Sequence, residues 1–121
     1  MAKGILTPQA KPAITTATAT ILAGQWLSTS VDLTAGNMVM LITPDDWTAA
    51  NIGFQFSEDN INFRDLYDDS GHMILKPIGP QRAINVDPTF TAGALYVKFV
   101  SGSRLNPVLQ AADRVFTIII Q

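Results

Sequence analysis

The sequence has 121 residues, of which 47% are hydrophobic and 15% charged, with 8 basic and 10 acidic side chains and a formal net charge of −2. This length corresponds to one domain, and the hydrophobic content excludes a disordered polyelectrolyte. The slightly negative charge argues against a dedicated nucleic-acid binder, which would carry a basic face. The absence of cysteine excludes disulfides, thiolate nucleophiles and cysteine-based zinc sites.

A stretch of 20 residues, 12–31, carries no charged side chain, and this is about the length of a membrane-spanning helix. Its composition does not suit lipid, because hydroxyl and amide side chains recur throughout it. The first ten residues also lack the apolar core of a signal peptide. We therefore expect a protein without a membrane anchor that is made in the cytoplasm.

Short β-strands are predicted along most of the chain, because β-branched and aromatic residues alternate with small or polar ones and turn residues recur about every ten positions. Residues 13–22 are rich in β-branched threonine and isoleucine, and over residues 16–20 threonine alternates with alanine, which places these two residue types on opposite faces. The segment 101–113 is expected to be a loop that could contain one helical turn at 108–112. The predicted strands are residues 13–22, 26–33, 38–42, 52–57, 62–67, 73–76, 82–86, 94–100 and 114–120.

This spacing predicts an all-β sandwich or barrel over residues 13–121, preceded by an extended N-terminal arm over residues 1–12. Alternation alone does not separate a jelly roll from an immunoglobulin-like sandwich, because the two differ in strand order. Residues 115–120 are apolar or threonine at every position, so this strand either lies centrally or is covered by a partner chain. The predicted core residues are Phe54, Phe56, Phe63, Leu66, Val97, Phe99, Phe116, Ile118 and Ile120, with Trp26 and Trp47 at the rim.

Catalytic and metal-binding motifs are missing: there is no GxSxG, HExxH, GxxxxGK[ST] or GxGxxG sequence, and His72 is the single histidine. The acidic doublets 45–46, 58–59 and 68–69 could act as acid and base or bind Ca²⁺. Each doublet nevertheless lies in a predicted turn, where aspartate commonly bonds the backbone. We therefore predict a protein that is not an enzyme and has no cofactor or metal site, with His72 as a solvated turn residue.

Two features, the arm and the loop 101–113, indicate contact with a macromolecular partner instead. The arm could strap across a neighbour, with a frayed terminus as the alternative, and the apolar residues of the loop 101–113 could either bind a partner or plug the end of the sandwich. Aromatic residues, Trp47 among them, could stack on sugars, with a place in the core or at an interface as the alternative. The predicted partner-binding residues are Lys3, Ile5, Leu6, Pro8, Lys11, Trp47, Leu105, Val108 and Leu109.

The most specific stretches of the sequence are PDDW at 44–47 with IGFQFS at 52–57, FRDLYDDSG at 63–71, and PVLQAADR at 107–114 leading into the last strand. Through them, residues 38–121 resemble a family of small virion structural proteins of tailed bacteriophages and prophages. The resemblance implies a single antiparallel, jelly-roll-like β-sandwich that serves as a capsid decoration, or cement, protein. Such proteins bind the outside of the head and hold neighbouring capsomers together.

The resemblance also implies where the protein works and what it contacts. We expect a location on the capsid surface of the virion after synthesis in the host cytoplasm. The expected partners are the major capsid protein and further copies of the chain, as a dimer or trimer, with no nucleic acid and no membrane. The alternative is a receptor- or glycan-binding module associated with tail or head fibres.

Overall fold

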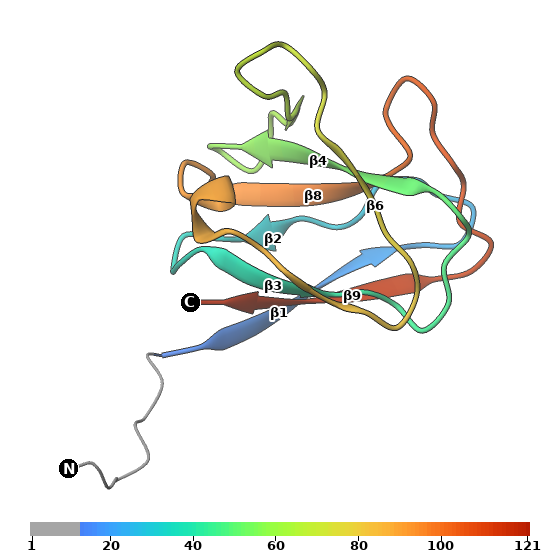
Figure 1. Ribbon diagram of the computed structural model, residues 1–121, viewed down its shortest axis with the longest axis horizontal. Helices are drawn as coiled ribbons and strands as arrows, with labels where there is room; N and C mark the ends of the chain where they lie inside the picture. The colour runs from blue at the N-terminus through green and yellow to red at the C-terminus, as the bar shows by residue number, and fades with distance from the viewer. Residues whose placement is uncertain (1–12) are drawn as a thin grey trace, which may run out of the picture.

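The computed structural model describes residues 13–121, so the predicted arm, residues 1–12, lies outside the described part of the chain. Two antiparallel sheets face each other (Figure 1). The β9 sheet contains, in spatial order, β1 (Thr15–Ile21), β9 (Arg114–Ile120), β3 (Met38–Ile42) and β7 (Ala83–Asn85). The β8 sheet contains β2 (Val31–Asp32), β8 (Tyr96–Ser101) and β4 (Asn51–Ser57), with β5 (Arg64–Asp65) and β6 (Leu75–Pro77) both pairing with β4. The predicted all-β antiparallel sandwich is confirmed.

The strands pair in a nested order. β1 pairs with β9, β2 with β8, β3 with β7, and β4 with β5 and β6. The chain therefore resembles one long hairpin folded over on itself, with successive strand pairs placed alternately in the two sheets. This arrangement brings residues near the two ends of the described chain side by side, since Thr15 lies opposite Ile120.

The core lies between the sheets and is built from alternate residues of the strands. The rings of Phe99 and Phe116 are 5.3 Å apart, and Phe54 meets Phe99 edge-on at 5.8 Å. Phe56 and Leu66 are partly buried against this core. The predicted core residues that are buried are Phe54, Val97, Phe99, Phe116, Ile118 and Ile120.

Phe63 does not belong to this core, so that prediction is wrong. The Nζ atom of Lys98 lies 4.4 Å from the centre of the Phe63 ring. Lys98 pairs with Gln55, the outward-facing neighbour of Phe54 and Phe56 on β4. Phe63 therefore packs on the outer side of the β8 sheet, where the ammonium group of Lys98 lies over the face of its ring.

The strand predicted at 26–33 is reduced to the two residues of β2. At Ser28 the backbone N–H donates to the carbonyl of Phe99, while the serine Oγ accepts from the Phe99 N–H at 2.8 Å. A side-chain oxygen therefore replaces the backbone carbonyl that a regular ladder would use. Ser28 and Val31 both point inwards, and the expected alternation shifts by one residue between them.

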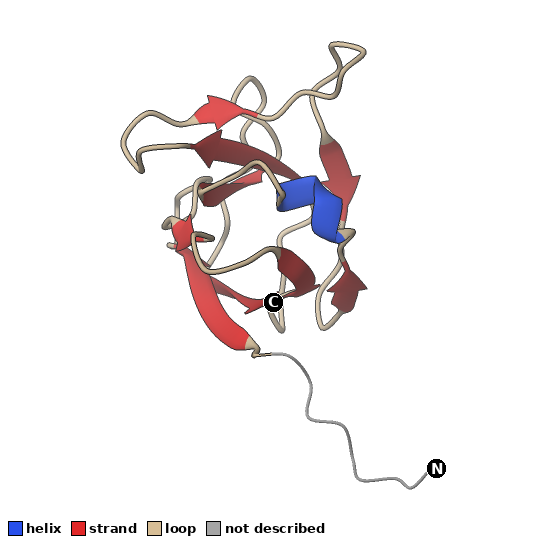
Figure 2. Ribbon diagram, turned by 90° about the vertical axis from the view of Figure 1, so that its left-hand side faces the viewer, coloured by secondary structure: helices blue, strands red, loops and turns tan. Residues whose placement is uncertain are grey.

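The helical turn expected at residues 108–112 is also absent; this segment is irregular in the structure. A short 3-10 helix instead occurs at Pro88–Thr91, where Asp87 caps the first turn (Figure 2). Thr91 is fully buried, and its hydroxyl accepts a 3.0 Å hydrogen bond from the N–H of Met38. This bond ties the helix to the start of β3.

Candidate functional site

Among residues 13–121, the strands of the β9 sheet place no charged side chain on its outer face. The register places Thr18 opposite Thr117, and Thr117 opposite Ile42 on the other side of β9. Alternation along each strand then identifies the remaining outward positions. We name this surface the docking face, and its residues are Thr16, Thr18, Thr20, Met40, Ile42, Ala83, Asn85, Val115, Thr117 and Ile119.

The docking face exposes apolar side chains to water. Val115 is 48% exposed and Ile42 is 37% exposed, while Met40 and Ile119 are half-buried by their neighbours. Apolar side chains exposed on one face of a sheet commonly mark an interaction site. β9 lies centrally within its sheet, which is one of the two arrangements predicted for residues 115–120. The other arrangement, in which a partner chain covers this strand, stays a prediction.

Trp47 lies at the rim of the core. Its ring is half-buried and meets Phe116 edge-on at 5.4 Å, and its indole N–H donates to the carbonyl of Ala50 at 3.0 Å. The expected place of Trp47 at the rim is confirmed. Its part in partner binding stays a prediction, because the packing against Phe116 accounts for one side of the ring.

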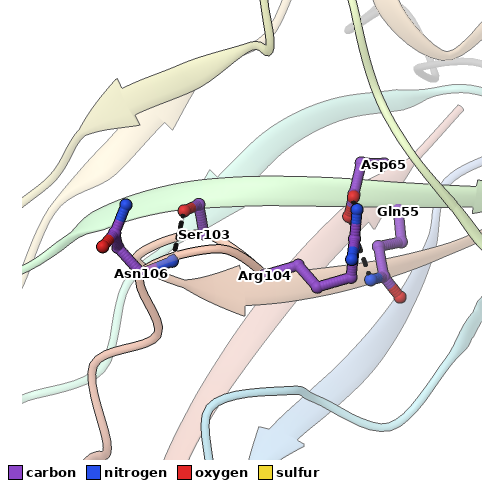
Figure 3. A network of polar contacts seen from close by, with 5 residues as sticks. All are labelled: Gln55, Asp65, Ser103, Arg104 and Asn106. Atoms are coloured by element: carbon purple, nitrogen blue, oxygen red, sulfur yellow. Dashed lines mark hydrogen bonds and ion pairs between the residues drawn. The ribbon is translucent and has the colours of Figure 1, made fainter.

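The loop 101–109 lies against β4 and β5 and is held there by polar contacts (Figure 3). The Nε atom of Arg104 donates to Asp65 at 2.6 Å, and the amide of Gln55 donates to the other oxygen of Asp65 at 3.1 Å. At the loop tip the Asn106 N–H donates to the Oγ of Ser103. The loop is therefore an ordered projection of the β8 sheet.

The apolar residues predicted at this loop lie on its surface. Leu105 is 65% exposed and Leu109 is 57% exposed, whereas Val108 is half-buried. Leu105 and Leu109 therefore do not plug the end of the sandwich, and their contact with a partner stays a prediction. The remaining predicted contact residues, Lys3, Ile5, Leu6, Pro8 and Lys11, lie outside the described residues.

An apolar cleft of about 240 Å³ opens between β6 and β7. Core side chains such as Met38, Ile52 and Phe54 form its wall, and Lys76 and Asp87 are its two charged residues. This lining suits an apolar group better than a polar substrate. Among residues 13–121, no group of three or more histidine, aspartate or glutamate side chains is close enough to hold a metal ion.

The carboxylates at two of the acidic doublets organise turns. Asp59 accepts hydrogen bonds from the backbone N–H groups of Ile61 and Asn62 at 2.9 and 2.8 Å, and from the hydroxyl of Ser57. Asp68 likewise accepts from the N–H groups of Ser70 and His72. The prediction that these residues form turns is confirmed for Asp59 and Asp68.

These hydrogen bonds predict a loss of stability in acid. Bonds to the charged form lower the pKa of Asp59, chiefly through the N–H groups of Asn62 and Ile61, and bonds from Thr34 and Thr89 lower the pKa values of Asp32 and Asp87. A folded-state pKa below the unfolded one stabilises the fold above the unfolded value, and this stabilisation disappears as the pH falls. We expect the urea midpoint to fall between about pH 5 and about pH 2.

The variant Asp59→Asn provides the control for this pH dependence. It removes the carboxylate whose pKa is lowered most, so its urea midpoint should change less with pH than that of the natural chain. Parallel midpoint curves for the two proteins would contradict the role assigned to Asp59.

Comparisons with known protein families, with curated proteins and with solved structures return no match for this chain. Within residues 13–121, no helix is long and apolar enough to cross a membrane.

Proposed function

We propose that this chain is a structural protein of a tailed-bacteriophage virion that binds the outer surface of the head as a decoration, or cement, protein. The observation that carries the proposal is the uncharged, partly apolar docking face of the β9 sheet. A protein that works by attachment needs a rigid fold and a surface that gains free energy when it is covered. The docking face supplies such a surface, and the resemblance supplies the major capsid protein as its partner.

The fold also supports this role. The nested strand order supports the jelly-roll topology that the resemblance implies. Many copies attached to a repeating shell bind more strongly than one copy, because each bound contact raises the effective concentration of the next. Weak contacts through the docking face and through the exposed Leu105 would therefore be enough to hold capsomers together.

The substitution Thr117→Lys tests the docking face. It places a charge at the centre of this face, between Thr18 and Ile42, where a bound capsid surface would have to desolvate it. We expect the variant to bind purified heads that lack the protein at least about tenfold more weakly, which corresponds to about 1.4 kcal/mol. Co-sedimentation with heads over a range of protein concentrations measures this.

The matched control is Ser70→Lys, which makes the same change of charge at an exposed turn between β5 and β6. It should bind heads as the natural chain does. Equal binding by the Thr117→Lys variant would contradict the docking face. The copy number in purified particles tests the location: hundreds of copies support the head surface, and a few copies would favour the tail- or fibre-associated alternative.

A further inference from the structure

The two sheets have four edges, and three of them carry features that discourage pairing with another chain. β7 has three residues. β2 has two residues, one of which is Asp32. The edge formed by β5 and β6 carries Arg64 and Lys76 and ends at Pro77. β1 differs, because it has seven residues with neither a charge nor a proline among them.

The backbone of β1 also has polar groups directed at this open edge. The N–H of Thr20 donates to the Oγ1 of Thr29, and the carbonyl of Thr20 accepts from the Thr29 N–H. These bonds show that Thr20 points its backbone groups away from β9, the neighbour of β1. Since the direction alternates along a strand, Thr16 and Thr18 point theirs the same way. Within residues 13–121, neither of these two has a backbone hydrogen bond on that side.

We infer that the open edge of β1 pairs antiparallel with the β1 edge of a second copy, around a two-fold axis, and so joins two β9 sheets into one continuous sheet. In such a pair the residue at the axis lies opposite its own copy, and every other residue lies opposite a residue of the same strand in the second copy. Like charges in facing positions are destabilising, and β1 and its flanks from residue 12 to residue 31 contain no charge. The absence of charge therefore fits a second copy better than a different protein, which could use charges for specificity.

The pairing has a consequence for the docking face. A two-fold axis that joins antiparallel edges runs perpendicular to the sheet, so both docking faces point to the same side. The dimer would then present two adjacent copies of one uncharged surface to a partner. The inference depends on the edge alone and not on the proposed virion role, because a dimer could form in a protein that binds no capsid.

The experiment uses the full chain and the variant Thr18→Pro. Proline removes the N–H that faces the open edge, and an edge strand tolerates proline at such a position. Sedimentation equilibrium from about 1 μM to about 1 mM should show that the natural chain dimerises and that the variant does so at least about tenfold more weakly. The control Thr117→Lys changes the cross-strand neighbour of Thr18 on the central strand, and it should dimerise as the natural chain does.

Amide hydrogen exchange followed by NMR provides the second measurement. The N–H groups of Thr16 and Thr18 should become more protected as the concentration of the natural chain rises. The double variant Thr16→Lys/Thr18→Lys sets lysines opposite each other across the axis and should be monomeric. It provides the test if Thr18→Pro does not fold. A natural chain that stays monomeric, or protection of these amides that does not depend on concentration, would overturn the inference. Loss of dimerisation in the Thr117→Lys variant would instead indicate face-to-face association, and so would also overturn it.

Discussion

The variant Phe116→Ala is expected to lose about 3–5 kcal/mol of unfolding free energy, because it removes a buried ring and leaves a cavity. Phe116 is fully buried. The centre of its ring lies 5.4 Å from that of Trp47, in the connection between β3 and β4, and 5.3 Å from that of Phe99 on β8. The ring therefore connects the two sheets, and the packing around it leaves little room for collapse. Urea unfolding should show a lower midpoint with an unchanged slope.

The neighbouring residue supplies the control for this prediction. Val115 lies on the same strand but points to the docking face, where it is 48% exposed. The variant Val115→Ala should change the unfolding free energy by less than about 1 kcal/mol, as is usual for exposed positions. Equal losses in the two variants would mean that β9 does not turn Phe116 towards the core.

The alternation that separates Phe116 from Val115 is local information, and this is why most strands could be predicted from the sequence. Residues 13–22 and 52–57 show it clearly, and both form strands. Phe63 shows where the same reasoning fails. Its position depends on the connection between β4 and β5, which places its ring on the outer face of the β8 sheet beside Lys98. Ser28 fails for a different reason: its hydroxyl competes with the backbone for the Phe99 N–H.

The docking face could be predicted only in part. The uncharged segments 13–22 and 115–120 are visible in the sequence. The apolar character of residues 115–120 also allows the prediction that a partner covers the last strand. Their combination into one surface depends on β9 lying between β1 and β3, which is a matter of strand order. The open edge of β1 depends in addition on which strand ends the sheet, and alternation within one strand carries no information about that.

The role of Gln110 could not be predicted from any sequence pattern. It lies in a loop among small and polar residues, yet only 1% of its surface is exposed. Its amide nitrogen donates to the carbonyl of Thr48 at 3.1 Å and to the Oγ of Ser101 at 2.7 Å, and its carbonyl oxygen accepts from the Thr48 N–H at 2.9 Å and from Arg114. These partners come from segments that are far apart in the chain.

The backbone of Gln110 completes the same junction. Its N–H donates to the carbonyl of Gln25, and its carbonyl accepts from the N–H of Gly24. One residue therefore connects the turn after β1, the segment between β3 and β4, the end of β8 and the start of β9. This junction explains why the segment 108–112 is irregular, since its groups bond to distant segments instead of to each other.

We expect Gln110→Leu to cost about 2–4 kcal/mol of unfolding free energy, because the polar groups of Thr48 and the hydroxyl of Ser101 would lose their partner inside the protein. Leucine has a similar size, so the loss would measure the missing hydrogen bonds more than a cavity. Gln25→Leu is the control, because Gln25 is exposed and the change should stay within about 0.5 kcal/mol. Urea unfolding of the three proteins measures both values. A Gln110→Leu variant as stable as the Gln25→Leu control would show that the loop is not fixed to the sandwich through this side chain.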